Sequence, residues 1–381
     1  MDMKDYRARI DEIDQQLVKL FCERMETARD IANYKKENDL PILDAGREKE
    51  KLASVCAMAP KALHNYTSVL YSSLFELSRS YQSQQMEQFT ELSEKISAAI
   101  DNTPRLFPPE ATVAVCGVEG AYAQIACEKL FKMPFPMYFN SFEGVFSAIE
   151  SGLCQYGVVP IENSTAGSVK KVYDLMTKHN FSIVRSVRLK VDHNLLANRG
   201  TKLEDITEIL SHEQAITQCE SFLKTLGKNI KITAVENTAT AAKMVAESGR
   251  TDLAALCSRS CMELYGLSCL KAGVQDQGNN YTRFICIGKN LEIYPGADRT
   301  SIQLSTAHKP GALYKLLSRF YALGINITKL ESRPIPDRDF EFMFYFDLET
   351  SVYSEEFIQI ICELSASTEE FTYLGSYSEM V

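Results

Sequence analysis

Polar and charged side chains follow directly after a predicted buried strand near the middle of the chain. The stretch from Tyr156 to Ser168 reads YGVVPIENSTAGS, and its apolar run from Gly157 to Ile161 is typical of a strand buried on both faces. Glu162 and Asn163 come where that strand should end, and Ser164 leads toward a helical pattern. A strand end that faces a helix N-terminus suits an anion, because free backbone N–H groups and the helix dipole favour negative charge there.

A second polar run, Asn280-Tyr281-Thr282-Arg283-Phe284, leads into another apolar strand. It places a hydroxyl, a guanidinium and an aromatic ring together at the start of that strand. Thr282 is better suited to donate a hydrogen bond than to release a proton, because a threonine hydroxyl is a poor acid at neutral pH. Glu162 is the candidate acid if burial keeps its carboxyl group protonated.

Length and composition limit what kind of protein this is. A chain of 381 residues is too long for one hydrophobic core and predicts two or three domains. The formal net charge of −9 argues against nucleic acid as a partner, because binding of phosphates needs a basic surface. The sequence shows neither an apolar signal segment nor a run long enough to cross a membrane. We therefore expect a cytoplasmic protein without a membrane partner.

The 11 cysteines are scattered along the chain without a paired C-x-x-C motif. We expect free thiols, buried as small apolar side chains in a reducing compartment. The closest group is Cys257, Cys261 and Cys269, which we expect in a helical stretch. This group has no histidine nearby and does not predict a zinc site.

The first hundred residues begin with a pattern of one long helix. From Asp5 to about Lys36 apolar residues recur every three or four positions without Gly or Pro, which predicts an apolar seam. At 1.5 Å per residue this helix spans roughly 45 Å, so we expect it to pack against a partner chain. Arg24 and Lys35 lie about 20° apart around the helix and share one face, whereas Arg7 lies about 100° from Arg24. For one such residue alone, snorkelling of the long side chain to solvent is an equal alternative.

Two further helices follow, one that starts after residue 44 and one from about residue 65 to residue 100. An acidic residue is placed to cap the second helix, and two polar residues four positions apart share a face of the third. The polar residues in question are Asp44, Arg47, Glu48, Ser78 and Gln82.

The runs VVPIENS and NYTRF together resemble prephenate dehydratase, and nearly the whole chain is similar to the bifunctional chorismate mutase–prephenate dehydratase family of phenylalanine biosynthesis. The resemblance implies an all-α chorismate mutase over residues 1–100 that forms an intertwined dimer. It implies a dehydratase of two α/β lobes over residues 110–290, similar to periplasmic binding proteins, and a ferredoxin-like ACT regulatory domain over residues 298–381. Chorismate and prephenate are the implied substrates, L-phenylalanine is the implied inhibitor, and no metal or cofactor is needed. A homodimer or homotetramer is expected.

For the mutase, the resemblance implies a site that acts by fixing the substrate and stabilising charge, because the rearrangement is a one-step pericyclic shift without a nucleophile. Its arginines and a serine would hold the two carboxylates: Arg7 from the other subunit, Arg24, Arg47 and Ser78. Lys35 and Gln82 would donate to the ether oxygen that breaks. Glu48 with Asp44 would accept from the ring hydroxyl. A solvated charged face is the alternative for this set.

For the dehydratase, aromatisation drives the loss of CO₂ and of the ring hydroxyl, so the enzyme has to assist departure of hydroxide. The resemblance implies that Thr282 faces this hydroxyl. The residues that would orient the substrate are Asn163, Ser164, Ser211, Gln218 and Phe284. Arg283 either pairs a carboxylate or braces its turn, and these two interpretations are equally supported. His212 is interpreted as structural.

The turn after the first strand of this region reads GVEGAYA. It departs from the family at Val118, Ala121 and Ala123, so we do not assign it to the site. It also lacks the dinucleotide fingerprint, which argues against a nicotinamide cofactor and against a fused prephenate dehydrogenase.

The last eighty residues predict the order βαββαβ, which is ferredoxin-like. Two motifs there are similar to the GAL and ESRP motifs of ACT domains that bind phenylalanine. Their residues are Gly311, Ala312, Leu313, Glu331, Ser332 and Arg333. Gly311 allows close approach of an α-carboxylate to a helix N-terminus. The alternatives are a domain that serves only dimerisation and, for the whole chain, a non-catalytic protein that senses phenylalanine.

Overall fold

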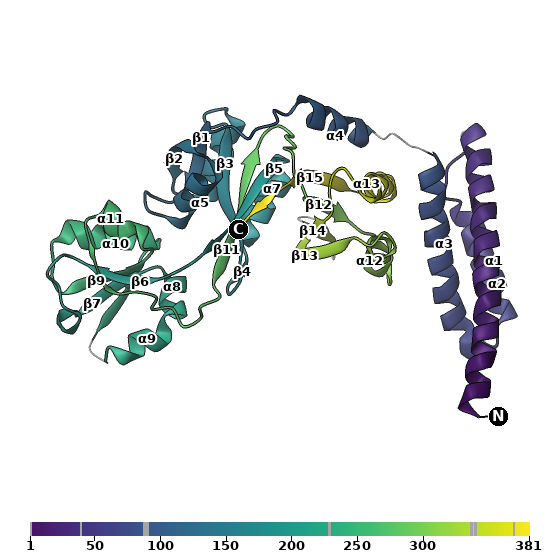
Figure 1. The fold of residues 1–381 in the computed structure, drawn as a ribbon, viewed down its shortest axis with the longest axis horizontal. Helices are drawn as coiled ribbons and strands as arrows, with labels where there is room; N and C mark the ends of the chain where they lie inside the picture. The colour runs from purple at the N-terminus through teal and green to yellow at the C-terminus, as the bar shows by residue number, and fades with distance from the viewer. Residues whose placement is uncertain are drawn as a thin grey trace. The chain divides into compact units, whose positions relative to one another are not determined.

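The computed structural model describes residues 2–38, 40–86, 91–227, 230–335, 338, 341–368 and 370–381. The chain forms two compact units (Figure 1). One comprises Met1–Ser97 with Gln303–Thr372, and the other comprises Ala98–Ile302 with Tyr373–Val381. None of the helices in the described part is both long and apolar enough to cross a bilayer.

The first unit starts with three helices: α1 (Met3–Glu37), α2 (Ala45–Met58) and α3 (His64–Met86). Asp2 and Asp5 form a capping box at the start of α1, and the Asp44 side chain accepts from the Arg47 N–H at 2.9 Å to cap α2. Both α1 and α2 pack against α3. The third helix was expected to continue to residue 100, but a separate helix, α4 (Glu91–Asn102), follows, and residues 87–90 lie outside the described part.

Most of the apolar seam of α1 is not covered within one chain. Ile10, Leu17 and Leu20 are 55%, 55% and 61% exposed, whereas Ala28 and Ala32 are buried. Large apolar side chains in a row on a solvent-facing helix are typical of an interaction surface.

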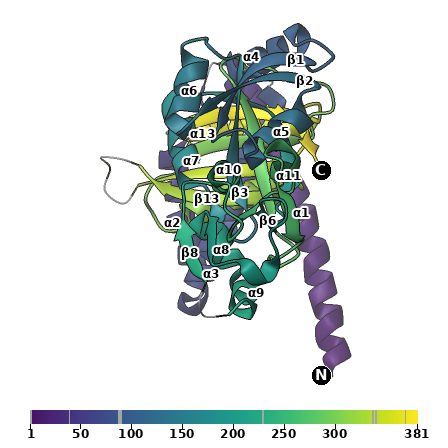
Figure 2. The same cartoon turned by 90° about the vertical axis from the view of Figure 1, so that its left-hand side faces the viewer.

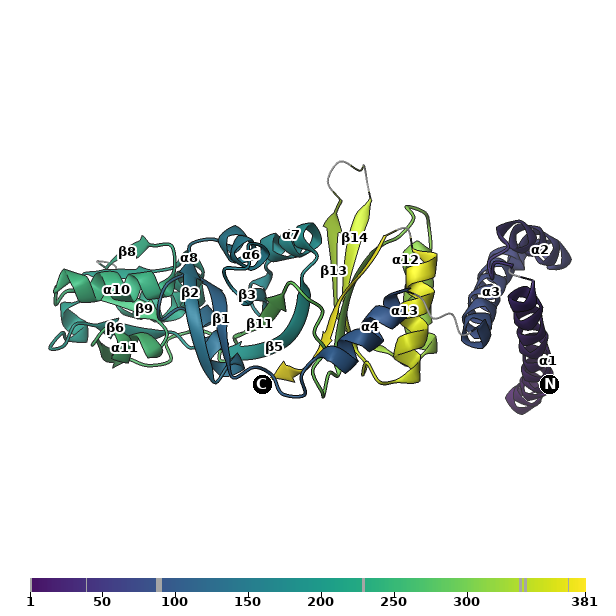
Figure 3. The same cartoon turned by 90° about the horizontal axis from the view of Figure 1, so that it is seen from above.

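The C-terminal elements follow the order βαββαβ: β12 (Arg299–Ser305), α12 (Ala312–Ala322), β13 (Asn326–Pro334), β14 (Phe342–Glu349), α13 (Glu355–Ser367) and β15 (Phe371–Tyr377). Their sheet has the strand order β13-β14-β12-β15, and α12 and α13 lie along one of its faces (Figure 3). The boundary between the two units passes through β12 and β15.

The second unit contains two α/β lobes. The sheet of the first lobe has the order β16-β5-β11-β3-β1-β2, with β4 paired to β3. Its strands are β1 (Glu110–Cys116), β2 (Met133–Phe139), β3 (Tyr156–Asn163), β4 (Gly167–Ser168), β5 (Ser182–Lys190), β11 (Tyr281–Gly288) and β16 (Glu379–Met380). The C-terminal end of the chain thus contributes a strand to this sheet, parallel to β5.

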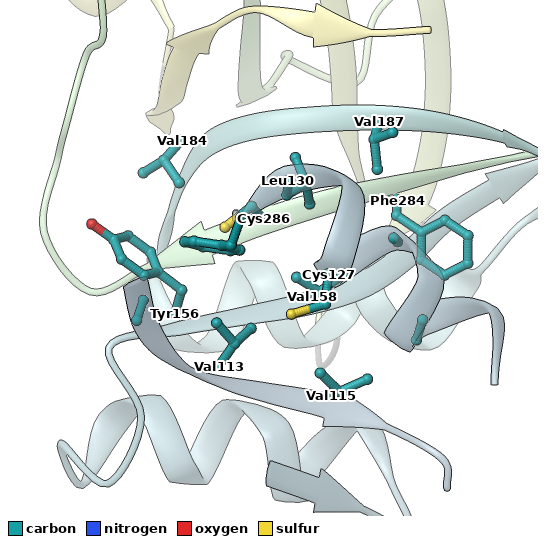
Figure 4. Packing of buried hydrophobic residues seen from close by; sticks show 14 of the residues in the cluster. Val113, Val115, Cys127, Leu130, Tyr156, Val158, Val184, Val187, Phe284 and Cys286 are labelled. Atoms are coloured by element: carbon teal, nitrogen blue, oxygen red, sulfur yellow. The ribbon is translucent and has the colours of Figure 1, made fainter. Parts of the chain in front are cut away.

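Helices cover both faces of this sheet: α5 (Tyr122–Leu130) lies on one face and α6 (Phe142–Glu150) on the other, where α6 contacts α7 (Lys170–His179) (Figure 2). On the α5 side Val113, Val158 and Cys127 belong to one buried cluster (Figure 4). On the other side Gly157 lets α6 approach β3, because a Cβ at this position would lie 2.6 Å from the Ile149 side chain.

The second lobe is built on a five-stranded sheet of order β10-β6-β9-β7-β8. Its strands are β6 (Asn194–Ala197), β7 (Glu208–Ser211), β8 (Lys231–Ala234), β9 (Leu253–Cys257) and β10 (Ser268–Lys271), and its helices are α8 (Glu213–Gln218), α9 (Glu220–Thr225), α10 (Thr238–Ser248) and α11 (Ser260–Leu264). The chain crosses between the lobes twice, at residues 191–193 and 272–280. Two lobes joined by two crossings confirm the two-lobed architecture predicted from the sequence.

The helix expected after Ser164 is present, because α7 begins at Lys170, and the two-residue strand β4 that precedes it pairs back onto β3. One local expectation was wrong. The cysteine group is not helical throughout, because Cys257 lies in β9 and Cys269 in β10. These extended segments pair with strands that are distant in sequence, and helical periodicity does not detect such pairing.

Candidate active sites

The register between β3 and β11 brings the two polar runs of the sequence together. These strands are antiparallel, and Thr282 lies opposite Asn163 while Arg283 lies opposite Glu162. Residues that are directly opposite in an antiparallel pair have side chains within contact distance of each other. Two segments more than a hundred residues apart therefore form one site.

Asn163 is at the centre of a hydrogen-bond network. Its Oδ1 accepts from the backbone N–H groups of Thr165 and Ala166 at 3.0 and 2.9 Å. Because backbone N–H groups can only donate, this contact fixes the orientation of the amide. The Nδ2 group then donates to Thr282 Oγ1 at 2.9 Å and to Asn280 Oδ1 at 2.8 Å. Since Thr282 Oγ1 accepts here, its own O–H points away from Asn163.

Gln218, at the end of α8 in the second lobe, extends this network across the two lobes. Its Nε2 donates to Thr165 Oγ1 at 2.8 Å, and Thr165 Oγ1 in turn donates to Asn163 Oδ1 at 2.7 Å. Its Oε1 accepts from Asn280 Nδ2 at 2.9 Å and lies 2.9 Å from His193 Nε2. The turn after β3, both crossings and α8 therefore meet at one polar cluster, which we call the junction network: Asn163, Thr165, His193, Gln218, Asn280 and Thr282.

His193 is a residue of this network that the sequence did not suggest. Its side chain is buried in the crossing between β5 and β6. Burial lowers the pKa of His193, and the hydrogen bond with Gln218 opposes this effect only in part. The ring is therefore neutral at neutral pH, and Nε2 carries the proton that it donates to Gln218 Oε1.

Glu162 and Arg283 form an ion pair of 2.9 Å between Oε1 and Nε. The Arg283 side chain is buried, and the carboxylate is its partner on β3. The contact ties the polar end of β3 to β11 one position along from the Asn163–Thr282 pair.

Other residues expected at this site have structural contacts. Ser164 donates to the Asn279 carbonyl at 3.0 Å and accepts from the Tyr281 N–H at 2.9 Å, which ties the two polar runs together. Ser211 is buried and donates to the Leu256 carbonyl at 2.7 Å. Phe284 belongs to the buried apolar cluster of the first lobe (Figure 4). The structure thus places Ser211 and Phe284 in the core, because their strands turn these side chains inward.

His212 is interpreted from the sequence as structural. In the structure its Nδ1 accepts from the Gln214 N–H at 3.3 Å at the start of α8. This contact caps the helix that carries Gln218.

In the helical domain, two of the predicted mutase residues meet: Arg24 of α1 and Ser78 of α3. Arg24 donates to Ser78 Oγ, and it donates to the Leu74 carbonyl at 3.3 Å. Burial lowers the pKa of Arg24, while Tyr71 and Glu48 oppose this effect. An arginine that is partly desolvated and faces a serine suits binding of a carboxylate.

Glu48 is held by a residue that the sequence analysis did not identify. Arg79 on α3 forms an ion pair with Glu48 Oε1. The same arginine lies 2.5 Å from Glu76 on its own helix. In the sequence pattern, Arg79 lies about 100° around α3 from Ser78, and such a position does not by itself indicate the mutase site.

The remaining mutase candidates are placed as follows. Lys35 donates to the Ile42 carbonyl at 2.5 Å. Gln82 is buried, and its Oε1 has no hydrogen-bond partner in the described part of the chain. Arg47 is exposed, as is Arg7, which lies about 25 Å from Arg24 along the axis of α1.

The candidate effector residues lie on α12 and β13. Gly311 precedes α12 with a φ of 82°, a left-handed conformation that favours glycine, and Ala312 and Leu313 begin the helix. Glu331, Ser332 and Arg333 lie on β13 opposite Tyr345, Phe344 and Met343 of β14.

Comparisons with known proteins match two parts of this chain to known enzyme families. The prephenate dehydratase family model matches residues 113–292, and the type II chorismate mutase model matches residues 6–83. The bifunctional chorismate mutase/prephenate dehydratase of Escherichia coli K12 is 30% identical over 381 residues, which is 97% of this chain and 95% of that protein. Arogenate dehydratase/prephenate dehydratase 2 of Arabidopsis thaliana is 37% identical over 297 residues, 75% of this chain and 76% of that protein.

Among solved structures, the prephenate dehydratase from Arthrobacter aurescens in complex with L-Phe is 25% identical, with a TM-score of 0.64 over 70% of this chain and 90% of that one. The order of the two matched domains and the similarity over nearly the full length carry the assignment. The chain therefore belongs to the bifunctional chorismate mutase/prephenate dehydratase family.

Proposed function

We propose that this enzyme rearranges chorismate to prephenate in its helical domain, residues 1–100, and converts prephenate to phenylpyruvate in its two-lobed domain, residues 110–290. The single observation that carries the second step is the junction network, in which Asn163 orients the Thr282 hydroxyl between the two lobes. The first step rests on the cluster of Arg24, Ser78 and Glu48 on three helices.

In the dehydratase step, Thr282 donates a hydrogen bond to the ring hydroxyl of prephenate. The C–C bond to the ring carboxylate breaks, CO₂ leaves, the electron pair enters the ring, and the hydroxyl departs as water after it gains a proton. A substrate carboxylate that takes Arg283 from Glu162 frees this acid to bind a proton and deliver it to the leaving hydroxyl. Asn163 and Gln218 orient the substrate at the junction of the lobes.

In the mutase step, no proton has to move, so the side chains supply position and charge. Arg24 with Ser78 binds one carboxylate, and Arg47 assists. Lys35 and Gln82 donate to the ether oxygen as its bond to carbon breaks. Glu48, with Asp44 nearby in sequence, accepts a hydrogen bond from the ring hydroxyl.

Dimerisation through α1 completes this site. Two observations support it: the apolar seam of α1 is exposed, and Arg7 is too far from Arg24 to share a site with it in the same chain. In an antiparallel pair of α1 helices, Arg7 reaches the site of the other subunit. A dimer formed through α1 can also pair with a second dimer to give a tetramer.

The C-terminal region, residues 298–381, is a ferredoxin-like ACT domain that binds phenylalanine and inhibits the enzyme. Its βαββαβ order supports this, as does the left-handed Gly311 before α12, where a built Cβ would meet no atom within 4 Å and a carboxylate has room to approach. The dehydratase from A. aurescens was solved with L-Phe bound. The described cysteines are free thiols, which suits a reducing compartment such as the cytoplasm.

The test is to supply purified protein with chorismate and no cofactor, and to follow phenylpyruvate by its absorbance in alkali, with and without phenylalanine. Phenylpyruvate that phenylalanine suppresses is the expected result. A Thr282→Val variant should accumulate prephenate instead, because the mutase remains intact. Arogenate, which carries an amino group in place of the keto oxygen, serves as the competing substrate. Absence of prephenate and phenylpyruvate from the wild-type reaction would refute the proposal.

A further inference from the structure

Glu76 of α3 is a buried carboxylate surrounded by three cations. It is only 7% exposed, and it lies 2.5 Å from Arg79 Nη2, 3.0 Å from Arg319 Nη2 and 3.4 Å from Lys315 Nζ. Burial by itself would raise the pKa of Glu76, but Arg79 and Arg319 outweigh it and lower the pKa. A charge in such a position is maintained only when its partners are held in place.

Two of these cations come from the C-terminal region. Lys315 and Arg319 are one turn apart on α12, which packs against α3 within the first unit. A second contact on the same helix has Ser80 donating to Glu363 of α13 at 2.7 Å. Helix α3, which carries the mutase residues Ser78 and Gln82, is thus held by the region proposed to bind phenylalanine.

Arg79 connects this cluster to the mutase site. Its Nη2 faces Glu76, and its Nη1 faces Glu48 Oε1, so the one guanidinium bridges two carboxylates on different helices. The Arg79 side chain is itself mostly buried. Burial alone would lower the pKa of Arg79, but Glu76 and Glu48 raise it, so the bridge stays charged. A planar guanidinium held on both sides has little freedom to rotate.

We propose that Arg79 is a positioning residue of the mutase: it fixes the Glu48 carboxylate, and it is itself fixed through Glu76 by Arg319 of α12. The proposal rests on the mutase role assigned above to Glu48. With Oε1 bound to Arg79, Oε2 is the oxygen that accepts from the ring hydroxyl of chorismate. Full mutase activity then depends on a residue of the C-terminal domain that does not touch the substrate.

A simpler alternative is that the ion cluster only attaches α12 to α3. In that case, loss of a cation lowers stability and affects both activities, or neither. A positioning role predicts instead a selective loss of the mutase activity, and it predicts that Arg319 acts only through Arg79. Both activities reside in one chain, so the dehydratase reaction on added prephenate is an internal control.

The experiment compares Arg79→Met, Arg79→Lys, Arg319→Gln and the double variant Arg79→Met/Arg319→Gln in the full-length protein. Arg338→Gln is the matched control, because Arg338 is an arginine of the same C-terminal region that pairs with Glu341 and Glu370 away from the cluster. The measured quantities are kcat and KM with chorismate, the dehydratase rate with prephenate, and the thermal midpoint by circular dichroism.

We expect Arg79→Met to lower mutase kcat/KM by roughly tenfold or more, and Arg319→Gln to lower it by a few-fold. These sizes follow from the coupling free energies of residues in contact, which correspond to changes of about 2- to 100-fold in an equilibrium or rate constant. Arg79→Lys should recover part of the loss. The double variant should be no slower than Arg79→Met alone, and the dehydratase rate should stay within about twofold of wild type.

Three results would overturn the proposal. They are a mutase effect of Arg319→Gln no larger than that of Arg338→Gln, additive losses in the double variant, and an equal fall of both activities together with the thermal midpoint. If the wild-type protein converts prephenate but not chorismate, the proposed mutase function fails, and this outcome is distinguishable from all three.

Discussion

Replacing Asn163 by aspartate tests whether this residue orients the proton of Thr282. The change keeps the size of the side chain, and Oδ1 can still accept from the backbone N–H groups of Thr165 and Ala166. In place of the Nδ2 donor, however, a carboxylate oxygen now lies 2.9 Å from Thr282 Oγ1. Two acceptors cannot share a hydrogen bond without a proton, so the Thr282 O–H turns toward the aspartate and is lost to the substrate.

The expected loss follows from the removal of one hydrogen-bond donor aimed at developing charge. Such a loss costs roughly 10²- to 10³-fold in kcat, or about 3–4 kcal/mol of transition-state stabilisation. The assay is phenylpyruvate formation from prephenate, with the mutase rate of the same protein as the control for folding.

A second variant separates this explanation from simple damage to the site. Thr282→Val removes the hydroxyl directly, so Asn163→Asp/Thr282→Val should be slower than Thr282→Val alone by no more than about threefold. An Asn163→Asp enzyme that keeps its dehydratase rate within about threefold of wild type would refute the reasoning, as would losses that multiply in the double variant.

Three further predictions concern single positions. Burial lowers the pKa of His193 in the folded chain below its ordinary value of 6.5, so on acidification the unfolded chain takes up this proton before the folded chain does, and stability falls as pH drops below about 6.5. The urea midpoint should therefore fall less between pH 7.5 and pH 5.5 in His193→Gln than in the wild type. Gly157→Ala should destabilise the enzyme by about 1–3 kcal/mol, because the new Cβ would lie 2.6 Å from Ile149, and a thermal midpoint equal to wild type would contradict this. Gly311→Ala strains a left-handed backbone by roughly 1–2 kcal/mol and should raise the phenylalanine concentration needed for half inhibition, while unchanged inhibition would remove Gly311 from the effector site.

Much of the fold could be predicted because its elements have strong periodicity. The seam of α1, the buried run of β3 and the βαββαβ order near the C-terminus all appear in the structure close to their expected bounds. The short strands β4 and β16 could not be predicted, because two residues carry no period. Each exists only through a partner strand that pairs with it.

The candidate sites could be predicted in part. Asn163, Thr282 and Gln218 were expected together and meet in the junction network. Phe284 and Ser211 have the residue types of a site but point into the core, because the face on which a strand residue lies depends on which sheet covers it.

The sequence by itself determined the residue types, the order of the domains and the chemistry that these residues can perform, because these depend on local pattern and side-chain chemistry. Tertiary structure alone decided which of them meet. Thr282 reaches Asn163 through the register of β11 on β3, and His193 reaches Gln218 through a crossing between lobes. Arg79 joins Glu48 to Glu76 because α2 packs against α3. Each of these contacts joins residues whose distance or relative orientation is set only when distant elements pack together. No local sequence pattern encodes such a contact.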